Sequence, residues 1–426
     1  MAWFGLLDCN NFYCSCERIF APALSTAPLV VLSNNDGCII SRSQEAKDLG
    51  IKMGTPVHLI QDLIRQHAIE VFSSNYTLYG DISARVMNTL SELCPVVEVY
   101  SIDEAFLDLS IFPSSELETF ARNIRKTVRQ WTKIPTCVGI GPTKALAKVA
   151  NRIAKKNPAH EGVFIIADEA TRLAALQDYE IGEVWGIGRK YAQMLQANGI
   201  ETAQQFTELP DEWVKSEMTI VGLRLLLELR GQSCLPMLSP RTLSKNICSS
   251  RSFGASQTNM ENISEAVSTF ASKCGEKLRE QKGCAGVITV FLQTNRFKPE
   301  QPQYSKSQTL NIPSPTGNSA ELIKYALHGL SQIYRAGYEY KKAGVIVTGI
   351  IPDDQVQQSM FDNGSRDRWD QISKAMDRIN GKYGRDTISF AVQGTKGKRT
   401  WQPRAERRSA AFTTDWHQLP KVSMSD

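Results

Sequence analysis

The sequence predicts a multidomain chain of mixed class, with an α/β part followed by an α+β part. Its 426 residues are enough for roughly two to four domains of ordinary size. In the first part, short apolar runs alternate with helical patterns, as is typical of an α/β domain. Further along, the predicted elements follow one another in the order βαββαβ. That order indicates an antiparallel or mixed sheet with helices on one face.

The α/β part covers residues 1–165. Apolar runs predict strands at 4–7, 29–32, 96–100 and 136–140, and helical periodicity predicts helices at 78–93 and 117–131.

Residues 166–235 read as short helices with short loops, and 236–246 read as a linker because two prolines interrupt any periodicity. The α+β part then covers 247–352, and the remainder, 353–426, is polar. Strands are predicted at 247–253, 285–292, 308–310 and 342–350, and helices at 263–280, 319–336 and, within the polar remainder, 369–380.

The composition is that of a water-soluble protein with real cores. Apolar residues make up 42% of the chain and charged residues 22%, and the net charge of +5 permits nucleic-acid binding without requiring it. No apolar run approaches the ~18 residues that a membrane span needs. No secretory signal is visible, and the ten cysteines lack zinc-site spacing. We therefore expect a cytoplasmic protein with reduced thiols and no membrane partner.

Three acidic residues are the first candidates for chemistry. Asp8 ends one apolar run, and the adjacent pair Asp103 and Glu104 follows another. Buried carboxylates are costly unless a positive charge neutralises them, and Mg²⁺ prefers such hard oxygen ligands. Two such ions stabilise the attacking and leaving oxygens of a phosphoryl transfer. The pattern suggests a two-metal nucleotidyl-transfer site; the alternative is three ordinary carboxylates at strand ends.

The residues after Asp8 fit such a site. The backbone carbonyl of Cys9 could also bind a metal ion. The aromatic ring of Tyr13 could lie under the sugar of an incoming nucleotide and clash with a 2′-hydroxyl. Alternatively, Tyr13 begins a helix and packs in the core.

Two basic stretches could contact phosphates. The segment 36–47 reads as a turn, a short strand and a helix start capped by Ser41 or Ser43, which places Arg42 and Lys47 near a helix N-terminus. Each could equally be a solvated surface charge. In the second stretch, Lys144, Lys148, Arg152 and Lys155 recur along one helix face without an acidic residue between them, which favours an anionic partner over a solvated face.

Two further segments suggest contacts with macromolecules. Gly186 and Gly188 form a hairpin-like turn followed by Arg189, and such a turn can offer backbone N–H groups to DNA phosphates; it can also be only a helix turn. Near the end of the chain, Gln357, Ser359, Met360 and Phe361 resemble a peptide that docks on another protein, although local packing is the alternative.

Together these stretches resemble the Y-family (translesion) DNA polymerases, and within that family the UmuC group, over nearly the whole chain. The resemblance rests on several ordered motifs: residues 8–13, 33–38, 45–47, 72–76, 100–106, 138–148, 184–189, 249–254 and 340–344.

The resemblance implies a right-hand polymerase. The palm would be 1–165 with fingers inserted at about 24–75, the thumb 166–235 with a helix-hairpin-helix, and the little finger 247–352. The tail, 353–426, would bind partners.

The resemblance also implies roles for individual residues. Asp8, Asp103 and Glu104 would hold two Mg²⁺ ions, and Tyr13 would be the steric gate against ribonucleotides. Lys155 would touch the triphosphate. Gln44 and Lys47 stand where many family members have a tyrosine and an arginine, and lysine offers a point charge instead of a bidentate fork.

The implied activity is error-prone copying of damaged template during the SOS response, with primer-template DNA and dNTPs as substrates. The implied partners are a UmuD′-like dimer, RecA and a sliding clamp, the last bound through residues 357–361. Two rival functions remain from the residues alone. A two-metal nuclease would use the same carboxylates, and a DNA-binding scaffold would keep the fold without activity.

Overall fold

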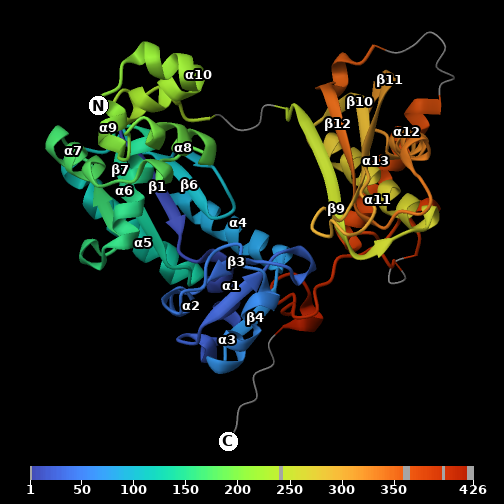
Figure 1. Cartoon of the computed structure of the whole chain (residues 1–426), viewed down its shortest axis with the longest axis horizontal. Coiled ribbons are helices and arrows are strands. Elements are labelled where there is room, and N and C mark those ends of the chain that lie inside the picture. Colours follow the sequence, from blue (N-terminus) through green and yellow to red (C-terminus); the bar gives the residue numbers. More distant parts are fainter. Residues whose placement is uncertain (1, 239–242, 358–364, 396–398, 420–426) are drawn as a thin grey trace, which may run out of the picture. The chain divides into compact units, whose positions relative to one another are not determined.

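The computed structural model describes residues 2–238, 243–357, 365–395 and 399–419. The chain forms two compact units (Figure 1). Unit 1 contains Met1–Ser33, Gly37–Pro240 and Arg407–Asp426, and unit 2 contains Asn34–Asp36 and Arg241–Glu406. The C-terminal residues thus belong to the same unit as the N-terminus.

Unit 1 is built on a five-stranded sheet with β1 at its centre. The strand order is β5-β6-β1-β7-β8, with bounds Val97–Val99, Glu104–Asp108, Phe4–Cys9, Thr136–Gly141 and Val163–Ile165. The strands predicted at 4–7, 96–100 and 136–140 are confirmed. The sequence analysis did not predict β6 or β8, because β6 begins and ends with a carboxylate and β8 has only three residues.

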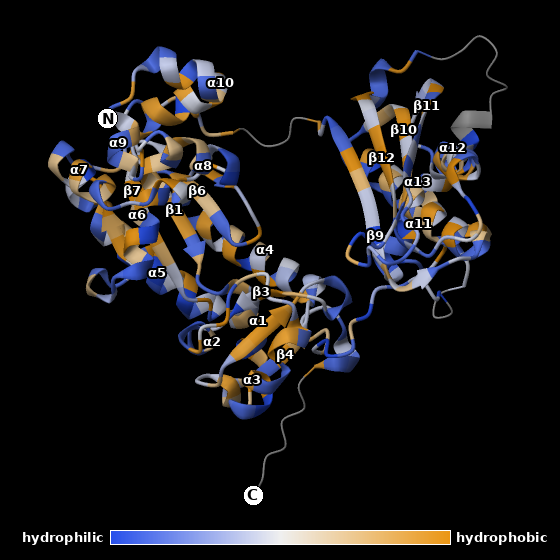
Figure 2. Ribbon diagram, viewed as in Figure 1, coloured by the Kyte–Doolittle hydropathy of each residue, from blue (hydrophilic) through white to orange (hydrophobic). Residues whose placement is uncertain are grey.

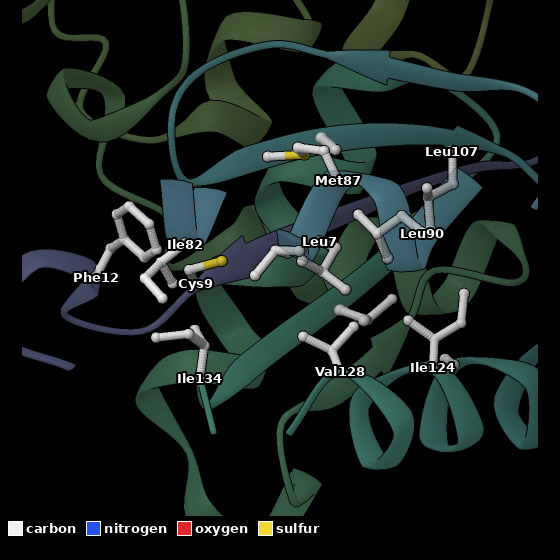
Figure 3. Packing of buried hydrophobic residues seen from close by; sticks show 14 of the residues in the cluster. Leu7, Cys9, Phe12, Ile82, Met87, Leu90, Leu107, Ile124, Val128 and Ile134 are labelled. Atoms are coloured by element: carbon white, nitrogen blue, oxygen red, sulfur yellow. The ribbon is translucent and has the colours of Figure 1, made fainter. Parts of the chain in front are cut away.

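Side chains alternate along β1 between the two faces of this sheet. Leu7 and Cys9 pack in the large core with helices α4 (Tyr76–Leu93) and α5 (Leu117–Thr132), as Figure 3 shows. Leu6 packs on the opposite face, with a residue of α6 (Lys144–Lys156). Because strand side chains alternate with period two, Asp8 falls on the α6 face.

Helix α6 lies very close to the sheet. A Cβ atom added at Gly139 of β7 would lie 2.0 Å from the backbone nitrogen of Asn151 on α6. The Asn151 side chain donates hydrogen bonds to the carbonyls of Leu6 (3.0 Å) and Cys137 (2.9 Å). The glycine thus allows the basic residues of α6 to reach the ends of β1 and β6.

A smaller sheet of unit 1 has the order β3-β2-β4, with bounds Ile39–Arg42, Leu29–Leu32 and Glu70–Ser73. Strand β2 is antiparallel to β3 and parallel to β4, and the three cover an apolar core of their own. The remaining helices of unit 1 are α1 (Phe12–Phe20), α2 (Gln44–Asp48), α3 (Gln61–Gln66), α7 (Glu169–Gln177), α8 (Arg189–Ala197), α9 (Ala203–Thr207) and α10 (Asp211–Leu229).

Unit 2 has the predicted βαββαβ order. Its elements are β9 (Asn246–Gln257), α11 (Met260–Glu280), β10 (Gly283–Thr294), β11 (Ser305–Thr316), α12 (Ser319–Ile333) and β12 (Tyr340–Pro352). The strand order is β11-β10-β12-β9, and every neighbouring pair is antiparallel. Apolar residues line the strands and the helix faces packed on them (Figure 2).

Strand β11 is longer than the predicted 308–310. Its sequence contains Pro313 and Pro315, which argue against a central strand. The strand lies at the edge of the sheet, where a missing N–H donor disrupts no ladder on the outer side.

Some of the described residues between 365 and 401 contribute to the core of unit 2, although this stretch of sequence is polar. Helix α13 spans Ser365–Tyr383, longer than the predicted 369–380, and Asp377 on it forms a two-pronged ion pair with Arg279 at 2.7 Å. Trp401 is buried and packs edge-on against Phe270, with ring centroids 5.6 Å apart. Arg399 is also buried, with its guanidinium over the Trp401 ring, 5.8 Å from the ring centroid.

A buried ion pair gives a stability prediction. Lys144 and Glu98 are both buried, with Nζ and Oε2 2.5 Å apart, and Glu98 also accepts the N–H of Leu238. Glu98→Ala leaves a buried ammonium without its carboxylate and is expected to lower the free energy of unfolding by about 3–5 kcal/mol in urea titration. Glu118→Ala, which breaks the exposed pair with Arg122, is the control and should cost at most about 1 kcal/mol. Equal losses in the two variants would contradict the argument.

Candidate active site

The three predicted carboxylates meet at one end of β1 and β6. Asp8 and Glu104 are directly opposite each other in the antiparallel pair, and Asp103 precedes Glu104 in the turn from β5. The N–H of Cys9 donates to the carbonyl of Asp103 (2.8 Å). The Ser101 hydroxyl donates to Asp103 Oδ1 (2.6 Å) and accepts the backbone N–H of Glu104 (3.1 Å). The turn is therefore tied to the end of β1 by the backbone.

Two lysines of α6 face these carboxylates. Lys155 Nζ donates to Asp8 Oδ1, and Lys148 Nζ lies 2.8 Å from Glu104 Oε2. Burial raises the pKa of Asp8 to about 6, and the Lys155 ammonium opposes that rise. Because one lysine does not offset the burial, Asp8 would be stabilised as a carboxylate by further positive charge.

The donor set suits Mg²⁺ by its chemistry. Within the described ranges, no three His, Cys, Asp or Glu side chains converge as a complete metal cluster. Mg²⁺ commonly binds through one or two carboxylates together with substrate phosphates and water. Asp8, Asp103, Glu104 and the Cys9 carbonyl are hard oxygen donors at one end of the sheet, so they fit an ion that substrate phosphates help to hold.

A pocket of about 350 Å³ opens beside the carboxylates. Six candidate site residues proposed from the sequence line it: Cys9, Tyr13, Arg42, Lys47, Asp103 and Lys155. Three cationic side chains, those of Lys47, Lys155 and Arg42, share its wall, which suits an anionic ligand such as a triphosphate.

Tyr13 stands at the start of α1, half-buried at the pocket. Its ring stacks on that of Tyr79, with centroids 4.5 Å apart and planes at 17°, and meets Tyr76 edge-on at 6.0 Å. Burial raises the pKa of the Tyr13 hydroxyl to about 12, so the side chain is a neutral phenol at physiological pH. The ring therefore has a fixed orientation on the pocket wall.

At two residues near the pocket, the structure differs from what the sequence predicted. Gln44 is exposed, donates to Asp48 Oδ1 (2.8 Å), and is absent from the pocket lining. Asn11, which the sequence analysis missed, lines the pocket and accepts a hydrogen bond from Lys47 Nζ (2.5 Å). Its left-handed backbone, with φ of 49°, is a conformation that asparagine tolerates better than most residues. The asparagine pair Asn10-Asn11 just after the strand was the available signal.

The basic stripe on α6 is paired with carboxylates from elsewhere in unit 1, which the sequence did not predict; its contact with an anionic partner stays a prediction. The pairs are Lys144 with Glu98, Lys148 with Glu104, Arg152 with Glu183, and Lys155 with Asp8. Helical spacing showed only the absence of acidic neighbours on the same helix. It carried no information about strands that pack against the helix.

The predicted DNA-contact turn precedes α8. Gly186 has a φ of +92°, Gly188 caps the helix, and both are exposed with Arg189, whereas Ile187 between them is buried. The buried isoleucine anchors the turn and leaves its glycines at the surface. The contact with DNA stays a prediction.

The predicted docking peptide lies mostly beyond what the structure describes. Gln357 is exposed, and its carbonyl accepts a hydrogen bond from the Ser314 hydroxyl (3.2 Å). Ser359, Met360 and Phe361 lie outside the described residues. Across the helices that the structure does describe, none combines the length and apolar character needed to cross a membrane.

Three parts of the chain match known protein families. Residues 7–152 match the impB/mucB/samB family and residues 244–360 match the C-terminal domain of the same family. Residues 370–422 match a domain of unknown function (DUF4113). The fold is similar to that of a solved Y-family DNA polymerase chimera, Dbh-Dpo4(243-245)-Dbh, with a TM-score of 0.66 and 21% identity over 82% of this chain and 99% of the other.

Full-length relatives are also similar. Protein UmuC of Salmonella typhimurium is 39% identical over 98% of this chain and 100% of its own length. Protein ImpB of Salmonella typhimurium is 38% identical over 98% of this chain and 99% of its own. A DNA polymerase IV of Moorella thermoacetica is 27% identical over 92% and 96%. The chain therefore belongs to the impB/mucB/samB family and is a UmuC-like DNA polymerase of the Y family.

Proposed function

We propose that this polymerase copies damaged template by adding dNTPs to a primer 3′-hydroxyl at the site formed by Asp8, Asp103 and Glu104. The observation that carries the proposal is the placement of these carboxylates at one end of β1 and β6, directly beside a pocket with a cationic wall. An in-line nucleotidyl transfer needs carboxylates that hold metal ions at the reacting oxygens, and it needs a cationic pocket that binds the triphosphate.

Asp8, Asp103, Glu104 and the Cys9 carbonyl would hold two Mg²⁺ ions, which would lower the pKa of the primer hydroxyl and stabilise the charge that develops on the phosphate oxygens. The other contributions come from the chain itself. The backbone pairing of β1 with β6 and the Ser101 hydrogen bonds fix where the carboxylates lie.

The pocket residues would bind and orient the nucleotide. Lys47 and Lys155 supply positive charge for the triphosphate, and Asn11 holds the Lys47 ammonium toward the pocket. The Tyr13 ring would lie against the sugar and exclude a 2′-hydroxyl. We keep Gln44 as a predicted nucleotide contact, which would require its side chain to turn away from Asp48.

The domain roles follow the same proposal. The large sheet of unit 1 would be the palm, the β3-β2-β4 sheet the fingers, and α7–α10 the thumb, with Gly186, Gly188 and Arg189 contacting DNA phosphates. The antiparallel domain of unit 2 would be the little finger. The setting would be SOS mutagenesis in the cytoplasm, where the ten free cysteines stay reduced.

The proposed protein partners are a UmuD′-like dimer, RecA and a sliding clamp. The similarity to UmuC supports the first two, and the sequence of residues 357–361 supports the third. Replacing Met360 and Phe361 together by alanine is expected to weaken clamp binding at least about tenfold, because large apolar anchors dominate such docking. Surface plasmon resonance with immobilised clamp measures the loss. Primer extension without a clamp should be unchanged, and unaltered clamp affinity would refute the docking role.

The test of the proposed function separates it from its rivals. Labelled primer-template is incubated with the protein and Mg²⁺, with and without dNTPs. Products longer than the primer, formed only with dNTPs, support the polymerase. Shortening of the primer without dNTPs would identify a nuclease, and binding without any change of length would identify a scaffold.

A further inference from the structure

The C-terminal segment of unit 1, residues 407–412, begins with a single bridge to the β4 edge of the β3-β2-β4 sheet. Ser73, the last residue of β4, forms a parallel bridge with Arg408. The Ser73 N–H donates to the Arg407 carbonyl (3.0 Å), and the Arg407 N–H donates to the Ser73 hydroxyl (2.9 Å). The segment is thus held by backbone pairing, across more than 330 residues of sequence.

Side chains on both sides reinforce this attachment. The Asn75 amide, at the N-cap of α4, donates to the carbonyls of Ser409 (3.2 Å) and Ala410 (3.2 Å) and to the Ser409 hydroxyl (3.0 Å). The ring of Phe412 stacks on Phe20 at the end of α1, with centroids 4.6 Å apart and planes at 14°. The segment therefore contacts α1, which carries Tyr13, and α4, which carries Tyr79.

A chain of contacts leads from this segment to Tyr13. The Ser409 hydroxyl donates to Glu17 Oε1 (3.1 Å), and the Tyr79 hydroxyl donates to the same oxygen (2.6 Å). Glu17 is 2% exposed and Tyr79 is fully buried. The Tyr79 ring in turn stacks on Tyr13 at 4.5 Å. Glu17 thus joins a C-terminal hydroxyl to the ring that supports the pocket tyrosine.

The positions on α1 are consistent with this linkage. Tyr13, Glu17 and Phe20 are spaced i, i+4 and i+7, which places them on one face of the helix. Burial raises the pKa of Glu17, and the hydroxyls of Tyr79 and Ser409 oppose the rise by donating to it. Burying the Glu17 carboxylate costs free energy, and the segment is already held by backbone pairing and an aromatic stack. Its hydrogen bonds fix a geometry that apolar packing alone would leave loose.

We propose that residues 407–412 brace the nucleotide pocket, with Ser409, Glu17 and Tyr79 as positioning residues that hold the Tyr13 ring in place and so sharpen the choice of deoxyribonucleotides over ribonucleotides. The inference rests on the proposed role of Tyr13. It gives the end of the domain of unknown function a role at the active site of unit 1.

The test compares kcat/KM for a dNTP with kcat/KM for the rNTP of the same base, in the full-length protein. Ser409→Ala and Tyr79→Phe each remove one hydroxyl that donates to Glu17, and each is expected to lower the dNTP-to-rNTP ratio about fivefold, the worth of one hydrogen bond. Ser409→Thr restores the hydroxyl and should restore the ratio. Thr414→Ala, at an exposed position two residues beyond this segment, is the matched control and should keep the wild-type ratio.

Tyr13→Ala, measured alongside, separates the two proposals. Suppose that Tyr13→Ala lowers the ratio, while Ser409→Ala and Tyr79→Phe change kcat/KM for the dNTP and for the rNTP by the same factor. The brace is then refuted and the gate stands. If Tyr13→Ala leaves the ratio unchanged, the gate and the brace both fail.

Combining Ser409→Ala with Tyr13→Ala should add no further loss of selectivity, because the hydroxyl acts through the ring that has been removed. An additive loss would overturn the brace. Should Tyr79→Phe fail to fold, Ser409→Ala and Ser409→Thr still decide the question.

Discussion

Asp103→Ala and Glu104→Ala are each expected to lower the rate of nucleotide addition at least about a thousandfold, because metal-assisted charge stabilisation supplies several kcal/mol of a phosphoryl-transfer barrier. Neither side chain belongs to the apolar cores, so both variants should fold. Binding of primer-template DNA should survive, since it depends on basic residues and on exposed backbone N–H groups. Single-turnover primer extension and fluorescence anisotropy measure the two properties.

A matched control lies on the same strand. Asp108 ends β6 as Glu104 begins it, but its carboxylate caps the N–H of Ser110 (3.0 Å) at the other end of the sheet. Asp108→Ala should retain near wild-type extension. Full activity in Asp103→Ala or Glu104→Ala would remove these residues from the reaction.

Tyr13→Ala is expected to lower the preference for deoxyribonucleotides by about 10–200-fold, the range that one steric group provides in a substrate pocket. The ring lines the pocket and is held by Tyr79, so its removal leaves room for a 2′-hydroxyl. The measurement is kcat/KM for matched dNTP and rNTP pairs.

Tyr13→Phe is the control for this experiment, because it keeps the ring and loses only the hydroxyl. It should discriminate as the wild type does. If Tyr13→Ala shows unchanged sugar selectivity, Tyr13 is a core aromatic and the gate lies elsewhere.

Much of the fold could be predicted because its signals are local. The apolar run at β2 (Leu29–Leu32) and the βαββαβ order of unit 2 depend on patterns a few residues long. Likewise, the sequence placed Asp8 and the Asp103-Glu104 pair near the ends of apolar runs, which is where carboxylates of such a site are expected. Because β6 was not predicted, the pairing of Asp8 with Glu104 across β1 and β6 is seen only in the structure.

The features that could not be predicted depend on contacts between parts of the chain that are distant in sequence. No local pattern shows that Lys148 would face Glu104, or that Ser409 would donate to Glu17 across 392 residues. Trp401 stands in a polar segment, and only the tertiary fold buries it. Gln44 stands at a position of the family motif that predicts a nucleotide contact. Its side chain instead donates a hydrogen bond to Asp48, one helical turn away.

The central claim is that this chain is a translesion polymerase that works through Asp8, Asp103 and Glu104. The most direct measurement is primer extension opposite an abasic site with Mg²⁺ and dNTPs, with and without a UmuD′-like dimer and activated RecA, comparing wild type with Asp103→Ala. We expect the wild type to insert a nucleotide opposite the lesion and the variant to insert none while still binding the DNA. Equal insertion by the two proteins, or no insertion by the wild type with any partner while DNA binding is intact, would contradict the claim.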